Sequence, residues 1–172
     1  MLDDGYNDES VSKNGEHTPW GKRRGGKYSL FDAGTHVPMM IQWKGKIKPA
    51  ESEALVSQHD MLASFAELVG ETAKPTDSQN TLATFLGESS KGRKTLVLQA
   101  LEGRTALRQD NWVFIPAYWG PETLEKENVE TGACSCYQLY DLNTDPGQKT
   151  NLAEKYPEKT KQMLATYNRI RG

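Results

Sequence analysis

A basic, glycine-rich loop that runs directly into a short hydrophobic segment constrains this chain more than any other feature. The loop and segment span residues 15–43, and four cations fall within the six positions 22–27. The Gly25-Gly26 pair allows positive φ and a close approach of the backbone to a ligand. Residues 37–43 are rich in apolar and β-branched side chains, and they predict a buried strand. Cations gathered on such a loop indicate an anion-binding site.

The overall composition excludes several classes of partner. A net charge of -2 and a pI near 6.0 argue against a nucleic-acid-binding domain, which is usually basic. No apolar run reaches the roughly 18–20 residues of a membrane span. The first ten residues are acidic and polar, unlike a signal peptide. A mean hydropathy of -0.72 is low for a self-contained domain, and it indicates long solvated loops or a surface that normally packs on something else.

The order of predicted elements divides the chain in two. A helix is expected from Ser57, with Asp60 three residues later as in a capping box, to Gly70. Its apolar residues Met61, Leu62, Phe65, Leu68 and Val69 share one face. From residue 95 the periodicity changes to two, which predicts strands over 95–101, 105–108, 112–115 and 137–142, the second and third of which form a hairpin. Residues 116–133 are expected to form an exposed loop. A last helix begins at Pro157, and its apolar residues recur at helical spacing: Met163, Leu164, Tyr167 and Ile170. The second half is therefore an α+β layer.

The two cysteines, Cys134 and Cys136, are one residue apart. A bridge between them would close a tight ring, and two ligands do not make a zinc site. Free thiols, or pairing with a partner outside the chain, remain open, and the compartment cannot be read from them.

Several motifs, taken together, resemble the type I sulfatases, which depend on formylglycine. Residues 24–38, RGGKYSLFDAGTHVP, resemble the family's segment R-G-G-K-x-S-x-x-E-G-G-T-R-V-P. Residues 139–147, LYDLNTDPG, resemble the family's later segment L-Y-D-L-x-x-D-P-x-E. The family's N-L-A follows that segment, and it is matched here at 151–153. The departures are Asp32-Ala33 for the usual Glu-Gly, His36 for Arg, and Gln148 for an acid.

The resemblance implies a fold and a division into domains. Residues 1–90 would be the C-terminal end of an alkaline-phosphatase-like α/β sulfatase domain, containing the loop, the strand at 37–43 and short helices. Residues 91–172 would be a small subdomain in which antiparallel strands pack with one C-terminal helix.

The resemblance also implies site residues. Lys27 aligns with the family's lysine that contacts a sulfate oxygen, a task suited to a point charge. Arg24 either holds the loop or reaches an anionic sugar. His17 is a candidate substrate contact or a loop-packing residue, and Trp20 could stack on a sugar or anchor the loop.

The remaining chemistry of the family is not found in the sequence. No Cys or Ser lies in a C/S-x-P/A-x-R signature, and Asp3-Asp4 looks like an acidic tail, so no metal ligand and no cofactor is assigned here. The parent protein is expected to use calcium and a formylglycine residue, and to act on a sulfated saccharide or aryl sulfate. The chain is then a C-terminal portion, inactive without the N-terminal catalytic part, of a periplasmic or secreted parent.

Two other functions remain open. The chain could be a stand-alone module that binds sulfated glycans or anions through the cations of the loop and Trp20. It could also be a subunit-contact domain that uses residues 116–133.

Overall fold

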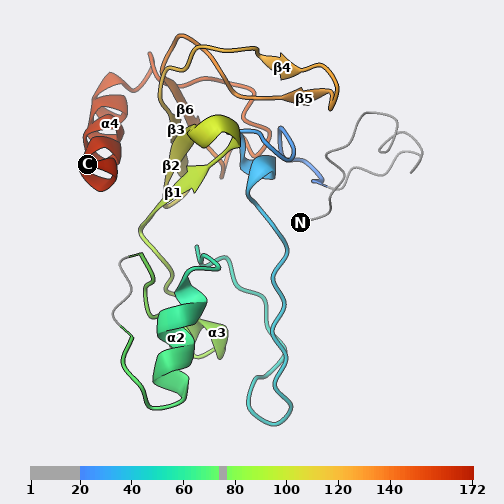
Figure 1. Cartoon of the computed structure of the whole chain (residues 1–172), viewed down its shortest axis with the longest axis vertical. Coiled ribbons are helices and arrows are strands. Elements are labelled where there is room, and N and C mark those ends of the chain that lie inside the picture. The colour runs from blue at the N-terminus through green and yellow to red at the C-terminus, as the bar shows by residue number, and fades with distance from the viewer. Residues whose placement is uncertain (1–19, 74–76) are drawn as a thin grey trace. The chain divides into compact units, whose positions relative to one another are not determined.

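The computed structural model describes residues 20–73 and 77–172, which belong to two compact units (Figure 1). The first unit comprises Met1–Pro38 and Val97–Gly172, and the second comprises Met39–Leu96. This division differs from the predicted boundary near residue 90, because the basic loop packs with the C-terminal half of the chain.

The first unit is built on a four-stranded sheet. The strands β1 (Thr95–Gln99), β2 (Thr105–Gln109), β3 (Trp112–Ile115) and β6 (Gln138–Asp141) lie in the order β1-β2-β3-β6. The short 3-10 helix η2 (Leu101–Gly103) connects β1 to β2. β3 pairs antiparallel with β2, as the sequence predicted, and also with β6, a partner that the sequence did not specify. Asp110, at the β2–β3 turn, has a φ of 51°, a conformation that Asp tolerates better than most residues.

Alternation along these strands sends side chains into two separate cores. Leu107, Phe114 and Leu139 are buried with Met163 and Tyr167 of helix α4 (Pro157–Arg171). Their strand neighbours are buried with Leu30 and Phe31, and these neighbours are Ala106, Val113, Ile115 and Tyr140. Because successive strand side chains point to opposite faces, the helix covers one face and the segment around Leu30 covers the other.

Helix α4 begins at the predicted Pro157, where a missing N–H costs nothing. Met163 and Tyr167 are buried as its spacing indicated, whereas Ile170 is exposed. The Tyr167 hydroxyl lies 2.7 Å from the hydroxyl of Thr105 on β2 and 2.9 Å from that of Tyr118. This polar cluster ties the helix to the sheet.

The expectation of an exposed loop over 116–133 is wrong in part. A small hairpin of β4 (Thr123–Leu124) and β5 (Val129–Glu130) lies within it. Val129, Thr131 and Ala133 are buried. A disulfide joins Cys134 to Cys136, with the Cα atoms 5.1 Å apart, so the structure forms the tight bridge that the sequence analysis disfavoured, in place of the free thiols or outside pairing that it left open.

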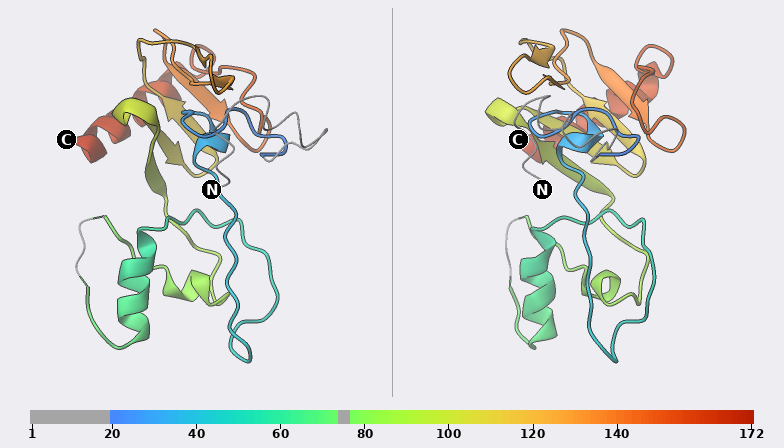
Figure 2. Two further views of the ribbon diagram at one scale, coloured as in Figure 1. Left: turned by 45° about the vertical axis from the view of Figure 1, so that its right-hand side comes forward. Right: turned by 90° about the vertical axis from the view of Figure 1, so that its right-hand side faces the viewer.

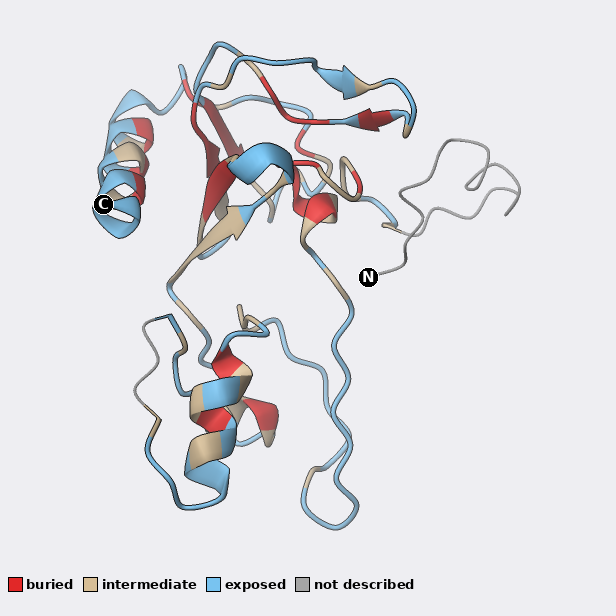
Figure 3. Cartoon of the chain, viewed as in Figure 1, coloured by how far each residue is buried: buried red, intermediate tan, exposed pale blue. Residues whose placement is uncertain are grey.

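The second unit contains α2 (Asp60–Leu68) and α3 (Leu82–Phe85). The Asp60 carboxylate is fully buried and accepts the backbone N–H groups of Ser57 and Gln79, both at 2.9 Å. It also forms an ion pair with Arg93. The predicted apolar face of α2 is largely uncovered, since Leu62, Phe65, Leu68 and Val69 are exposed in this structure (Figure 3).

The strand predicted at 37–43 is not formed. This segment has no regular secondary structure, is drawn without an arrow in both views of Figure 2, and exposes Met40 and Trp43. A strand needs a neighbour to accept and donate its backbone hydrogen bonds, and no strand of the described chain pairs with it.

Among the described helices, none is long and apolar enough to cross a membrane.

Candidate functional site

The basic loop presents Lys27 on a tight turn. The Ser29 N–H donates to the Gly26 carbonyl at 3.0 Å, so Lys27 and Tyr28 are the two central residues of the turn. Tyr28 has a φ of 84°, the value that a type II turn requires at its third position and that normally selects Gly. The fold therefore imposes an unfavourable backbone conformation on Tyr28, directly after Lys27.

Two glycines allow the loop to fold back on itself. Gly25 has a φ of 84°, and a Cβ there would overlap the side chain of Ser29. A Cβ on Gly34 would overlap the Ser29 carbonyl and lie 3.0 Å from the Gly26 carbonyl oxygen. Any larger residue at either position would push the turn away from the chain that packs beneath it.

The loop is fastened to the segment that begins with β5. The Ser29 hydroxyl donates to the Glu130 carbonyl at 2.5 Å, and the Leu30 N–H donates to the Thr131 carbonyl at 2.8 Å. Leu30 and Phe31 follow into the core of the sheet. The position of Lys27 is thus set by residues that lie about 100 positions later in the sequence.

Arg24 is fully engaged in holding this arrangement. Its Nε and Nη2 donate to the two carboxylate oxygens of Glu130, at 2.7 and 2.6 Å, and its Nη1 donates to the Gln148 carbonyl at 2.8 Å. The guanidinium also lies 4.0 Å from the centre of the Phe31 ring. The hydrogen bond with Arg24 lowers the pKa of Glu130, and the same bond raises the pKa of Arg24. These contacts match the loop-holding role, while contact with a sugar stays a prediction.

Asp32, in the 3-10 helix η1 (Asp32–Gly34), anchors the other end of the loop. Its buried carboxylate receives Arg23 Nε at 3.0 Å, His36 Nδ1 at 3.0 Å and Arg108 Nη1 at 3.3 Å. Its own N–H donates to Gln148 Oε1 at 2.7 Å. Burial raises the pKa of Asp32, but His36, Arg108 and Arg23 together outweigh burial and the pKa is lowered.

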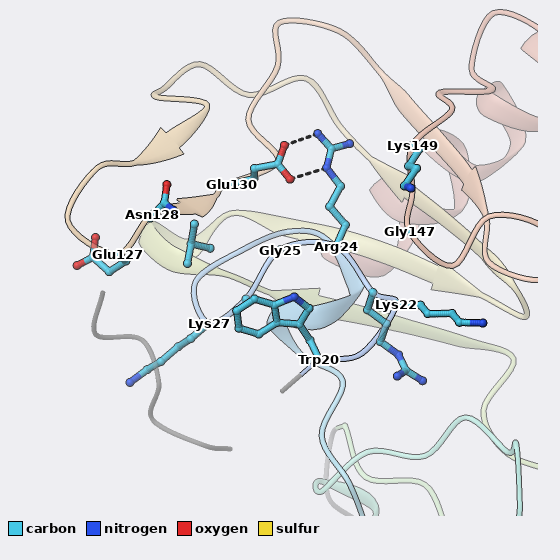
Figure 4. Close-up of a pocket in the computed structure, with 13 residues that line it drawn as sticks. Trp20, Lys22, Arg24, Gly25, Lys27, Glu127, Asn128, Glu130, Gly147 and Lys149 are labelled. Carbon is cyan, nitrogen blue, oxygen red and sulfur yellow. Dashed lines mark hydrogen bonds and ion pairs between the residues drawn. The ribbon is translucent and has the colours of Figure 1, made fainter. Parts of the chain in front are cut away.

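These elements surround a pocket of about 420 Å³ in the first unit (Figure 4). Trp20, Arg24 and Lys27, three of the four predicted site residues, line it together. The fourth, His17, lies outside the described residues. The other lining residues are Lys22, Arg23, Gly25, Gly26, Glu127, Asn128, Val129, Glu130, Gly147 and Lys149.

The pocket favours an anionic ligand. Five of its lining residues are cationic and two are acidic, and one of the acids, Glu130, is already paired with Arg24. The Lys27 ammonium lies 5.1 Å from the centre of the Tyr28 ring. In Figure 4 the Lys27 side chain extends outward from the rim of the pocket, away from Trp20 and Arg24. Positive charge focused in a concave site raises the local concentration of anions.

Sequence reasoning missed the wall contributed by Glu130 and Lys149. Glu130 lies in the segment expected to be an exposed loop, so nothing in its local pattern marked it. The position of Lys149 was a usable signal, because it comes two residues after Asp145-Pro146-Gly147, a sequence typical of a turn, and a turn fixes the direction of the residues that follow. Gln148, which directly precedes Lys149, is fully buried and contacts both ends of the loop, at Arg24 and at Asp32.

The described residues do not supply a metal centre. No group of three or more His, Cys, Asp or Glu side chains gathers within residues 20–73 and 77–172 in a way that could hold a metal ion. The calcium and formylglycine expected for the parent protein remain predictions.

Comparison with known proteins supports one family. Residues 11–71 match the family model described as Sulfatase. The chain is 38% identical over 167 residues to an N-acetylgalactosamine-6-O-sulfatase of Bacteroides thetaiotaomicron, covering 95% of this chain and 32% of that relative. It is 27% identical over 147 residues to mouse arylsulfatase K, covering 78% of this chain and 24% of the relative.

A solved structure agrees with these sequence matches. The chain superposes on a solved structure described under the metabolism of multiple glycosaminoglycans by Bacteroides thetaiotaomicron. The TM-score is 0.88 at 35% identity, and the match covers 96% of this chain and 35% of that one. The predicted small antiparallel sheet packed with one C-terminal helix is confirmed. The chain spans about a third of the length of the first of these relatives.

Proposed function

We propose that this chain, whose sequence is consistent with a C-terminal portion of the sulfatase family, supplies one wall of the substrate site of a protein that hydrolyses sulfate esters of carbohydrates. The observation that carries the proposal is the placement of Lys27, on a turn that the rest of the fold holds rigidly, at the rim of a cationic pocket. The pocket's volume is in the range of sites that bind small ligands.

Lys27 would act by stabilising charge on the sulfate group. As the ester bond breaks, negative charge grows on the sulfate oxygens and the leaving oxygen, and an ammonium aimed at one of these oxygens binds the transition state more tightly than the substrate. Arg24 donates through Nε, Nη1 and Nη2 to Glu130 and Gln148 and would keep the loop in place. Trp20 offers a flat apolar surface for a sugar ring.

The attacking group would come from elsewhere in a longer protein. A formylglycine residue and calcium, which the sulfatase resemblance implies, would supply the nucleophile and polarise the sulfate when present. No described residue is assigned to either. We therefore expect the 172-residue chain to be inactive on its own.

The partner that completes the site would be the catalytic part of the same protein. The relatives are about three times as long as this chain, judged by the covered share. The uncovered apolar residues of the second unit, among them Met40, Trp43, Phe65 and Val69, are the surface expected to pack against that part.

The proposal is tested with two forms of the protein. Purified chain should show no turnover of an aryl sulfate, with or without calcium. In a longer natural form that contains residues 1–172, Lys27→Ala should lower kcat/KM by about 10²–10³-fold, the usual effect of removing one group that stabilises transition-state charge. Lys46→Ala, which removes an exposed lysine of the second unit, is the control. Turnover by the 172-residue chain above its Lys27→Ala variant would overturn the expected inactivity.

A stand-alone anion-binding module is the second candidate, because the pocket's cations and Trp20 all lie within the described chain. Sequencing the coding DNA upstream of Met1 separates the two. An in-frame C/S-x-P/A-x-R signature there supports the sulfatase, whereas a genuine start at Met1 together with salt-sensitive binding of a sulfated sugar supports the module.

A further inference from the structure

The cations of the pocket fall into two groups separated by Trp20. Figure 4 shows Lys27 on one side of the Trp20 ring and Lys22 and Lys149 on the other, with the Arg24–Glu130 pair between the two sides. A single sulfate ester needs one of these groups. The other is left without an assigned ligand.

Charge pairing distinguishes the two sides. Glu130 is bound by Arg24, and Arg23 is bound by the buried Asp32. Glu127, the remaining acid of the pocket, lies on the Lys27 side in Figure 4. Within residues 20–73 and 77–172, neither Lys22 nor Lys149 has an ion-pair partner. Positive charge that is not neutralised by the protein therefore concentrates on the Lys22–Lys149 side.

The two lysines lie on adjoining segments of backbone. The position that a Cβ of Gly147 would occupy lies 3.4 Å from the Lys22 carbonyl oxygen and 3.3 Å from Lys149 Cε, so both residues flank Gly147. Gln148, between Gly147 and Lys149, is fully buried, accepts the Asp32 N–H and accepts Arg24 through its carbonyl. The two lysines thus project from adjoining segments, and buried Gln148 anchors the segment that carries Lys149.

We propose that the Lys22–Lys149 side binds a second anionic group of the substrate, so that the site selects acidic saccharides with two negative charges. The second group is a uronate carboxylate or a further sulfate ester, carried on the sugar next to the one held at Lys27. The proposal rests on the proposed function for the placement of the first sulfate. It assigns Lys22 and Lys149 as specificity-determining residues.

The test is calorimetric titration of the 172-residue chain at low salt with matched disaccharides. One carries a single sulfate ester, a second adds a uronate carboxylate, and a third adds a second sulfate. The wild type should bind the dianionic sugars at least about tenfold more tightly than the monosulfate, as one charge-assisted hydrogen bond would give. The double variant Lys22→Gln/Lys149→Gln should lose that preference, so that it binds the dianionic sugars and the monosulfate with affinities that differ by less than about twofold.

The control Lys44→Gln/Lys46→Gln removes the same charge from exposed positions of the second unit and should keep the preference. The proposal is overturned if Lys22→Gln/Lys149→Gln keeps the preference, if the control loses it equally, or if the chain binds no dianionic disaccharide. Lys27→Gln tests the proposed function separately. If this variant binds the monosulfate as well as wild type does, the role of Lys27 fails, whatever happens to the preference for two charges.

Discussion

The guanidinium of Arg24 holds both carboxylate oxygens of Glu130 across 106 residues of sequence. This two-pronged contact joins the basic loop to β5 and so closes the pocket on one side. The planar fork of arginine fits a carboxylate in a way that the single ammonium of lysine cannot. The pair is partly exposed, with 31% of the Arg24 and 47% of the Glu130 side chain accessible, so solvent weakens it.

Glu130→Gln should weaken the attachment of the loop without unfolding the sheet. Because the pair is partly exposed, the free energy of unfolding should fall by only about 0.5–1 kcal/mol. Urea denaturation followed by far-UV circular dichroism measures this, and the difference from wild type should shrink at high salt. Glu125→Gln, an exposed acid in the same hairpin segment, should change nothing. A loss of the same size in both variants would contradict a specific role for the Arg24 contact.

The Tyr28→Gly variant should be more stable to unfolding than the Tyr28→Ala variant. Its φ of 84° costs an L-residue on the order of 1 kcal/mol, which glycine avoids. Tyr28→Gly and Tyr28→Ala both remove the ring, so their difference in unfolding free energy isolates the backbone. We expect Tyr28→Gly to be the more stable by about 1 kcal/mol, the reverse of the usual order. Equal stability, or a more stable alanine variant, would show that the turn relaxes at no cost.

The cluster around Asp32 should make the first unit sensitive to acid. Its pKa is lowered in the folded chain, so the folded state binds this proton less readily than the unfolded state. The stabilisation is therefore present above the unfolded pKa of about 3.9 and is lost as pH falls through the folded value. Urea midpoints should drop below about pH 4 in the wild type. Asp32→Asn should be less stable at neutral pH and should flatten this dependence, whereas Glu154→Gln, at an exposed position, should leave the dependence unchanged.

The second unit should depend strongly on Arg93. Burial raises the pKa of Asp60. The hydrogen bonds from Arg93 and from the backbone N–H groups of Gln79 and Ser57 outweigh burial, so the pKa is lowered overall and the carboxylate stays charged. Arg93→Met leaves that buried charge without its partner, which costs about 3–5 kcal/mol. Amide exchange should then accelerate throughout α2, with the sheet of the first unit unaffected. Lys94→Met, an exposed neighbour, is the control, and unchanged protection of α2 in Arg93→Met would refute the claim.

The sequence determined those parts of the protein that depend on local pattern. The alternation along 105–115 and 137–142 and the spacing of Met163 and Tyr167 were enough to predict the hairpin, the β6 strand and helix α4, because burial follows from period alone. The motif around Lys27 was also recognisable in the sequence, since a tight glycine-rich turn is encoded by adjacent residues.

The tertiary structure decided what lies opposite these local elements. Glu130 and Lys149 join the pocket only because the chain returns to the loop more than 100 residues later, and no local period encodes such a pairing. The segment 37–43 has the composition of a strand, yet it stays unpaired and exposed in the described chain. Strand propensity is a preference for a pleated, half-buried surface, and it forms a strand only where a neighbouring strand supplies the hydrogen bonds.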